Sequence, residues 1–241
     1  MYRVTPLVPP SPLPTDVVQK FKALRLDALR SAPSFFSSEY SYEAELSDAE
    51  WIDTICHPIH HVLICEEIRA EEVQDCGQGD PRNAALHGHE WVGMLILCGP
   101  LSRDQYILLK HQHELIGRDE EETRWHLVGL YIQSSHRCKD TAVAIHEAIL
   151  DFLRCWTDDH LETIVDEATG TERQKSARIT GVLKSGDPLL TDLYQALGGS
   201  EIGWVTRADA LRMTDNEGLL RILENDEAAK PWLAMERVIE C

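Results

Sequence analysis

The stretch that most constrains the fold of this chain runs from Trp125 to Trp156. It opens with an apolar run rich in strand-favouring residues, 125–132, which is typical of a buried strand. After a short polar and basic link, a helix is predicted to begin at Asp140, because apolar residues recur at steps of three and four. This apolar stripe consists of Ile145, Ala148, Ile149, Phe152 and Trp156. A strand that leads through a tight loop into a helix points free backbone N–H groups at the loop, so the stretch predicts an anion-binding site.

The charge balance limits the partners of the chain. Its 241 residues carry 41 acidic and 23 basic side chains, a formal net charge of −18. This excess disfavours nucleic acids and anionic membranes as partners, and it favours a cationic or amine substrate. The length and the 43% of hydrophobic residues suit a soluble globular protein with a sizeable core.

The cysteines and the apolar runs indicate in which cellular compartment the protein resides. Seven cysteines are scattered, odd in number and without a Cys-x-x-Cys pair, which indicates reduced thiols rather than a disulfide framework. The N-terminus has no apolar core of a signal peptide, and the longest apolar run, 91–98, is far too short to span a membrane. We therefore expect a cytoplasmic protein. Its oligomeric state is left open, with a homodimer as one option.

Periodicity and turn residues predict alternating strands and helices within one α/β (α+β) domain, residues 1–241. Strands are expected at 2–5, 60–68, 91–98, 125–132, 177–183, 200–206 and 232–239. Helices are expected at 16–30, from a capping box at Ser47, around 106–115, from Asp140, and from Asp187 to 197. The regions near 69–90, 101–123 and 207–230 are expected to be insertions, the last of them helical, and the acidic run 119–122 is expected to be a solvated face.

The link after the central strand resembles the cofactor loop of the GNAT family of N-acetyltransferases. In that family an arginine or glutamine precedes a Gly-x-Gly/Ala loop that wraps the diphosphate of acetyl-CoA. Arg137 and Ala142 match this pattern, whereas Cys138 and Asp140 stand where the family has glycines. Glycine lets the backbone approach phosphate closely, and Asp140 adds a carboxylate at that place, although as an N-cap it would stabilise the helix by about 1 kcal/mol.

Two further segments are similar to this family. The helix motif Arg25–Leu29, the turn 32–36 and Trp51 follow a layout that is common near its N-terminus. Residues 187–199 are similar to its second motif, in which Leu193-Tyr194 and Gly198 match and Asp187 replaces an asparagine. The order of elements is also that of the family, so the resemblance implies a mixed, mostly antiparallel seven-stranded sheet, flanked by helices and splayed between strands four and five.

The resemblance also implies roles for single residues. Tyr194 would be the general acid that protonates the thiolate leaving group, and His126, early on the central strand, would be the general base. The implied cofactor-binding residues are Leu130, Tyr131 and Ile132 for the pantetheine arm, Arg137, Cys138, Lys139, Asp140, Thr141 and Ala142 for the diphosphate, and Asp187. The implied activity is acyl transfer, most simply of acetyl, from CoA to an amine of a small molecule or peptide.

Other interpretations stay open at this stage. One is a GNAT-fold protein with different chemistry, a lyase, decarboxylase or cyclase in specialised metabolism, which binds CoA weakly or not at all. Another is a binding module without catalytic activity. Cys138 could serve as a nucleophile, because basic neighbours and a helix N-terminus lower the pKa of a thiol. No metal site is predicted, because the histidine groups 57–61, 87–89 and 111–113 lack zinc-site spacings.

Overall fold

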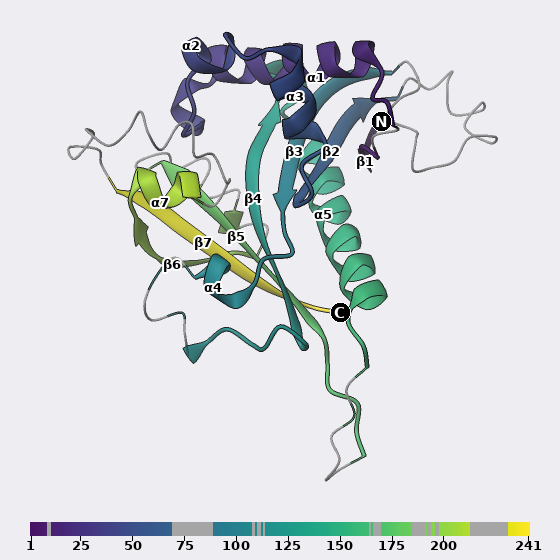
Figure 1. The fold of residues 1–241 in the computed structure, drawn as a ribbon, viewed down its shortest axis with the longest axis vertical. Coiled ribbons are helices and arrows are strands. Elements are labelled where there is room, and N and C mark those ends of the chain that lie inside the picture. Colours follow the sequence, from purple (N-terminus) through teal and green to yellow (C-terminus); the bar gives the residue numbers. More distant parts are fainter. Residues whose placement is uncertain are drawn as a thin grey trace, which may run out of the picture. The chain divides into compact units, whose positions relative to one another are not determined.

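A computed structural model describes residues 1–8, 11–68, 89–107, 109, 112, 114–163, 165, 170–184, 191, 194–195, 198–212 and 231–241 (Figure 1). Its strands are β1 (Tyr2–Pro6), β2 (His60–Glu67), β3 (Glu90–Cys98), β4 (Glu122–Ile132), β5 (Ser176–Lys184), β6 (Ser200–Val205) and β7 (Trp232–Glu240). Its α-helices are α1 (Thr15–Ser31), α2 (Tyr40–Glu43), α3 (Asp48–Ile55), α4 (Arg103–Tyr106), α5 (Lys139–His160) and α7 (Arg207–Arg212). Two short 3₁₀ turns are η1 (Pro33–Phe35) and η4 (Ser134–His136).

The strands form one seven-stranded sheet in the order β1-β2-β3-β4-β5-β7-β6. β1 pairs with β2, β5 with β7 and β6 with β7 in antiparallel fashion, whereas β4 and β5 are parallel. The parallel register runs from Glu122 opposite Ser176 to Leu127 opposite Gly181, although both strands continue beyond it. This mixed sheet, with a short parallel ladder between strands four and five, confirms the predicted fold class.

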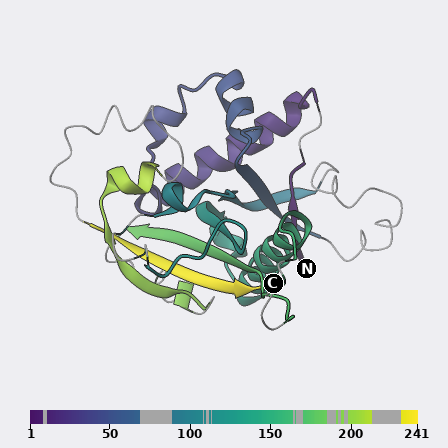
Figure 2. The same ribbon diagram turned by 60° about the horizontal axis from the view of Figure 1, so that its bottom comes forward.

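The chain divides into two compact units, residues 1–97 with 129–148, and residues 98–128 with 149–241. In the first unit, α1, α2 and α3 gather together in both views (Figures 1 and 2). The predicted apolar face of α1 is buried, and Phe21 meets the ring of Trp51 from α3 edge to face, 6.0 Å between centroids. The predicted capping box is confirmed, because Ser47 and Glu50 each accept a hydrogen bond from the other's backbone N–H.

In the second unit, the first half of β4 lies beside β5, and β7 lies between β5 and β6 (Figure 2). Trp125 is fully buried and packs edge to face against Phe152 and Trp156, at 5.6 and 5.1 Å between ring centroids. These two residues belong to the apolar stripe that predicted the helix. Ile145 and Ile149 of the stripe are buried, whereas Phe152 and Trp156 are partly buried.

Some predicted boundaries are wrong or lie outside the described residues. α1 begins at Thr15, so Asp16 lies in its first turn rather than at its cap, and α4 is a short helix upstream of the one expected around 106–115. Outside the described residues lie 69–88 of the insertion expected near 69–90, 213–230 of the one expected near 207–230, and Asp187. Glu90 already belongs to β3. The division into one domain with insertions stays a prediction. None of the described helices combines the length and the apolar composition needed to cross a membrane.

Candidate functional site

The candidate cofactor site begins where β4 passes through a glycine in a left-handed conformation. Gly129 has φ +65°, a value that side-chain-bearing residues rarely adopt, and it interrupts the alternation of faces along the strand. A glycine with this conformation inside a strand is typical of a β-bulge, which redirects the side chains and backbone groups that follow. The last three residues of β4, Leu130–Ile132, are the ones expected to face a pantetheine arm.

Tyr131 is the most firmly held of these three residues. Its side chain is buried, and its hydroxyl donates to the Oδ2 of Asp27 at 2.7 Å and lies 2.9 Å from the Oγ of Ser31, both on α1. Burial raises the pKa of the Tyr131 phenol, so it is protonated at neutral pH. The side chain of Tyr131 therefore fastens the end of β4 to α1 and leaves only backbone groups for a ligand.

Arg137 is held back against the strand that precedes it. Its Nε donates to the carbonyl oxygen of Ile132 at 2.8 Å, and its guanidinium carbon lies 5.8 Å from the ring centroids of both Phe35 and Tyr131. The side chain remains exposed beside the loop. The predicted cofactor-binding arginine is therefore positioned by the fold and accessible.

The start of α5 corrects the predicted cap. The helix begins at Lys139, and the carbonyl oxygen of Cys138 accepts the first helical hydrogen bond, from the N–H of Ala142 at 3.1 Å. Cys138 is thus the N-cap, and Asp140 lies in the first turn. The Cys138 Sγ lies 3.2 Å from the Oγ1 of Thr141, whose hydroxyl donates to the carbonyl oxygen of His136 at 2.6 Å. Aspartate is a better N-cap residue than cysteine, which is why the sequence favoured Asp140. The turn Ser134–His136 ends early enough for the helix to begin at Lys139, so the N-cap falls two residues before Asp140.

The cap position changes the chemistry of Cys138. The contact with the Thr141 hydroxyl and the backbone N–H groups of Thr141 and Asp140 lower the pKa of this exposed thiol. Around it the loop carries the cations Arg137 and Lys139 and the carboxylate of Asp140, all of them exposed. The loop can therefore receive an anion at a helix N-terminus, but one of its own carboxylates competes for the same position.

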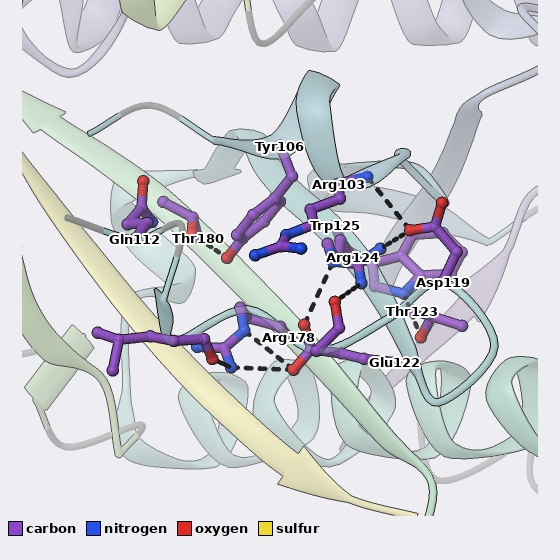
Figure 3. Close-up of polar contacts among 12 residues, drawn as sticks. Arg103, Tyr106, Gln112, Asp119, Glu122, Thr123, Arg124, Trp125, Arg178 and Thr180 are labelled. Atoms are coloured by element: carbon purple, nitrogen blue, oxygen red, sulfur yellow. Dashed lines mark hydrogen bonds and ion pairs between the residues drawn. The ribbon is translucent and has the colours of Figure 1, made fainter. Parts of the chain in front are cut away.

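The second unit holds a polar cluster on the opposite face of β4 from Trp125. Arg178 of β5 donates to Glu122 of β4 at 2.9 and 3.1 Å and to Glu236 of β7 at 2.7 Å. Arg124 pairs with Glu122 at 3.2 Å and with Asp119 (Figure 3). We call Glu122, Arg124, Arg178 and Glu236, which are all buried, the buried charge network. Burial alone would lower the pKa of the Arg178 guanidinium, but its two carboxylate partners outweigh burial and raise it.

Tyr106 of α4 closes one side of this network. Its hydroxyl donates to the Oε1 of Glu236 at 3.0 Å. The same hydroxyl contacts the hydroxyl of Thr180 (Figure 3). Gln112 donates to the same carboxylate oxygen at 3.0 Å. Burial and the charge of Glu236 raise the pKa of the Tyr106 phenol. Each charged group in the network has an oppositely charged partner within the unit, which is the arrangement expected of a structural element.

His126 lies next to the network and is fully buried. Its ring stacks on that of Tyr106, with 5.0 Å between centroids and 9° between planes, and neither ring nitrogen has a hydrogen-bond partner among the described residues. Burial lowers the pKa of His126 to about 3, so the imidazole is neutral at pH 7. The expected general base is therefore a weakly basic side chain in a dry environment.

Tyr194 packs over β5 of the same unit. Its ring occupies the space where a Cβ on Gly181 would lie, and it packs against Leu183, Leu233 and Met235. Burial raises the pKa of the Tyr194 phenol, so the hydroxyl keeps its proton at neutral pH, as a general acid must. The expected acid and base both lie in the second unit, whereas the described cofactor-binding residues all belong to the first.

Sequence reasoning missed the pairing of Glu122 with Arg178, because the acidic run at 119–122 predicts a solvated face. The interpretation is wrong for Glu122, which is 4% exposed in its side chain. The one signal in the sequence was an arginine in the middle of an otherwise apolar strand, because a buried cation requires an acidic partner. Among the described residues, no three histidine, cysteine or acidic side chains come together as metal ligands, and residues 87, 111 and 113 lie outside that part of the chain.

Comparisons with known proteins identify the fold. No protein-family model and no curated protein sequence matches the chain. Among solved structures, NAA60 from Arabidopsis thaliana in complex with acetyl-CoA aligns over 100% of this chain and 98% of its own, with 9% identity and a TM-score of 0.51. The ribosomal-protein-S5-alanine acetyltransferase from Vibrio fischeri aligns over 98% and 92%, with 9% identity and a TM-score of 0.50. The GNAT domain of S. lividans PAT aligns over 99% and 90%, with the same identity and score. The chain therefore has the GNAT fold along its whole length.

Proposed function

We propose that this protein transfers an acyl group, most simply acetyl, from CoA to an amine of a peptide or small molecule. The observation that carries the proposal is the loop from β4 to α5, where the anchored Arg137 and the first turn of a long helix offer cations and backbone N–H groups to an anion. The similar structures named above include acetyltransferases, one of them with acetyl-CoA bound.

The residues present fit the two ends of this cofactor differently. Arg137, Lys139 and the N–H groups of the first α5 turn would hold the diphosphate, while Asp140 would repel it. Backbone groups of Leu130–Ile132 would hold the pantetheine arm, since the Tyr131 side chain is already engaged with α1. CoA would supply the thioester that makes the acyl group transferable.

Tyr194 and His126 are the proposed acid and base. A phenol whose pKa is raised by burial stays protonated and can give its proton to the departing thiolate sulfur. His126 would take the proton of the attacking ammonium directly or through water. With a pKa of about 3 it is a weak base, so this role requires the ring to become hydrated when the acceptor binds. The net charge of −18 favours a cationic acceptor, as an amine is before it loses its proton.

Calorimetric titration of the full chain with acetyl-CoA tests the proposal. We expect saturable binding that Arg137→Glu abolishes, because the substitution replaces the anchored cation by a second loop carboxylate. The matched control is Arg154→Glu, the same charge change at an exposed position near the other end of α5, which should leave binding unchanged. Absence of binding at millimolar acetyl-CoA would refute acyl transfer from CoA.

One observation favours the second candidate, a GNAT-fold protein with different chemistry. Asp140 is exposed in the first turn of α5, at the place where a diphosphate would bind. The double variant Cys138→Gly and Asp140→Gly separates the two candidates. If it gains affinity for CoA, the wild-type loop has merely weakened a CoA site. If it ignores CoA while the protein binds another ligand, a lyase, decarboxylase or cyclase is the better account.

A further inference from the structure

Arg25 of α1 is clamped on two of its three guanidinium nitrogens. Its Nε and Nη2 donate to the two carboxylate oxygens of Glu43 at 2.8 and 2.6 Å, a bidentate pair. The guanidinium carbon lies 4.8 Å from the ring centroid of Phe36, so one face of the group is also covered. These contacts fix the direction of the third nitrogen, Nη1, without using its two hydrogens.

The Nη1 of Arg25 is buried, and no acceptor among the described residues receives a hydrogen bond from it. It points to the left-handed glycine of β4, because it would lie 3.6 Å from a Cβ placed on Gly129. The next neighbours of that Cβ position are carbons of the Ile96 side chain, at 3.8 Å. A side chain at position 129 would therefore contact this fixed, unsatisfied donor, and glycine keeps the backbone of β4 next to it free of side-chain atoms.

The charges around this position select the kind of ligand atom. Arg25 and Glu43 already form a neutral pair, with side chains 14% and 8% exposed. A second carboxylate would place two anions on one guanidinium in a partly dry environment, which is unfavourable. An uncharged carbonyl oxygen can accept from Nη1 without that penalty, and a carbonyl oxygen that gains negative charge during a reaction binds more strongly.

The geometry points to Arg25 as a catalytic residue whose Nη1 donates a hydrogen bond to the carbonyl oxygen of the acyl group on the donor thioester. This inference rests on the proposed function. With the diphosphate at α5 and the arm along Leu130–Ile132, the acyl end of the donor lies next to Gly129, roughly 13 Å back along the strand from residue 133 at about 3.3 Å per residue. The hydrogen bond strengthens as the amine nitrogen adds to the carbonyl carbon and the electron pair moves to the oxygen.

The test compares the affinities of acetyl-CoA and CoA, since only acetyl-CoA carries the carbonyl oxygen. Gly129→Ala places a methyl group in the space 3.6 Å from Nη1 and leaves the residues of the Arg25–Glu43 pair unchanged. We expect it to lower the acetyl-CoA affinity about tenfold, the loss expected for one hydrogen bond from a charged donor, and to leave the CoA affinity unchanged. Arg25→Lys, which keeps the charge but not the fork, should have the same selective effect.

A matched control removes backbone strain as an explanation. Gly170 has φ +66°, and a Cβ there would meet nothing within 4 Å, so Gly170→Ala introduces the same strain without filling the space. It should bind both ligands as the wild type does. If Gly129→Ala and Arg25→Lys weaken acetyl-CoA and CoA equally, or neither at all, Arg25 does not contact the carbonyl. If the wild type binds neither acetyl-CoA nor CoA, the proposed function itself fails. Failure of the inference about Arg25 alone is therefore recognised by a wild type that still binds both ligands.

Discussion

The buried charge network and the loop at the start of α5 use similar side chains in opposite ways. In the network, two arginines and two glutamates neutralise one another, and Tyr106 and Gln112 donate hydrogen bonds to Glu236. In the loop, Arg137, Lys139 and Asp140 are exposed next to a helix N-terminus. The difference teaches that a charged residue indicates a binding site when its hydrogen-bonding capacity is left over, and a structural role when that capacity is used within the fold.

The largest effect that this comparison predicts is the loss of folding stability when Arg178 is replaced. Arg178→Met leaves Glu122 and Glu236 buried without their shared cation, and we expect the free energy of unfolding to fall by about 3–5 kcal/mol. Urea denaturation measures it. The control is Arg173→Met, which removes a half-exposed partner of Glu121 and should cost less than about 1 kcal/mol. Equal losses in the two variants would mean that the network is not structural.

The next effect concerns the pH dependence of stability through His126. Its pKa is about 3 in the folded protein and about 6.5 when unfolded, so the unfolded state binds the proton first. The stability that the neutral ring contributes is therefore complete above pH 6.5 and is lost as the pH falls towards 3. Between pH 6.5 and 4.5 we expect a loss of about 2–3 kcal/mol that His126→Leu abolishes.

This second prediction is measured by urea denaturation at several pH values. His160→Leu, the same substitution at an exposed position at the end of α5, is the control. A His126→Leu variant with the same pH slope as the wild type would show that His126 is already hydrated in the folded protein. That result would bring its pKa into the range of a general base.

The smallest effect lies in the loop. Asp140→Asn removes the carboxylate that competes with a diphosphate, and we expect the affinity for CoA to rise about tenfold, or about 1.4 kcal/mol. Asp151→Asn, an equal charge change at an exposed position further along α5, is the control for calorimetry. Because Cys138 rather than Asp140 is the N-cap, the stability should change by only a few tenths of a kcal/mol. Wild-type protein that retains CoA tightly through purification would contradict this prediction.

Local patterns in the sequence predicted much of the fold. The apolar run and helical stripe at 125–156 became β4 and α5, and the capping box at Ser47 formed as expected. These features depend on neighbours within a few residues, which the sequence shows directly. The predicted N-cap of α5, Asp140, lies two residues after the observed one, Cys138. Residue preference alone could not show where the preceding turn ends.

The pairing of distant residues could not be predicted in the same way. Arg178 meets Glu122 because six residues of β4 and β5 align in parallel, a register that no local pattern determines. The spare nitrogen of Arg25 depends on a carboxylate on α2 and a glycine on β4. The resemblance indicated Tyr194 and the loop as candidates, but their roles stay predictions until binding and activity are measured.

The sulfur cap of α5 makes the oxidation history of a sample part of its chemistry. Cys138 is exposed with a lowered thiol pKa, and the thiolate is the form that peroxides attack. Oxidation to the sulfinic acid would add a permanent anion beside Asp140, and its oxygens would accept hydrogen bonds from the N–H groups of Thr141 and Asp140 that an incoming anion needs. An aged preparation would then bind anions less well than a freshly reduced one, although its sequence and its fold were the same.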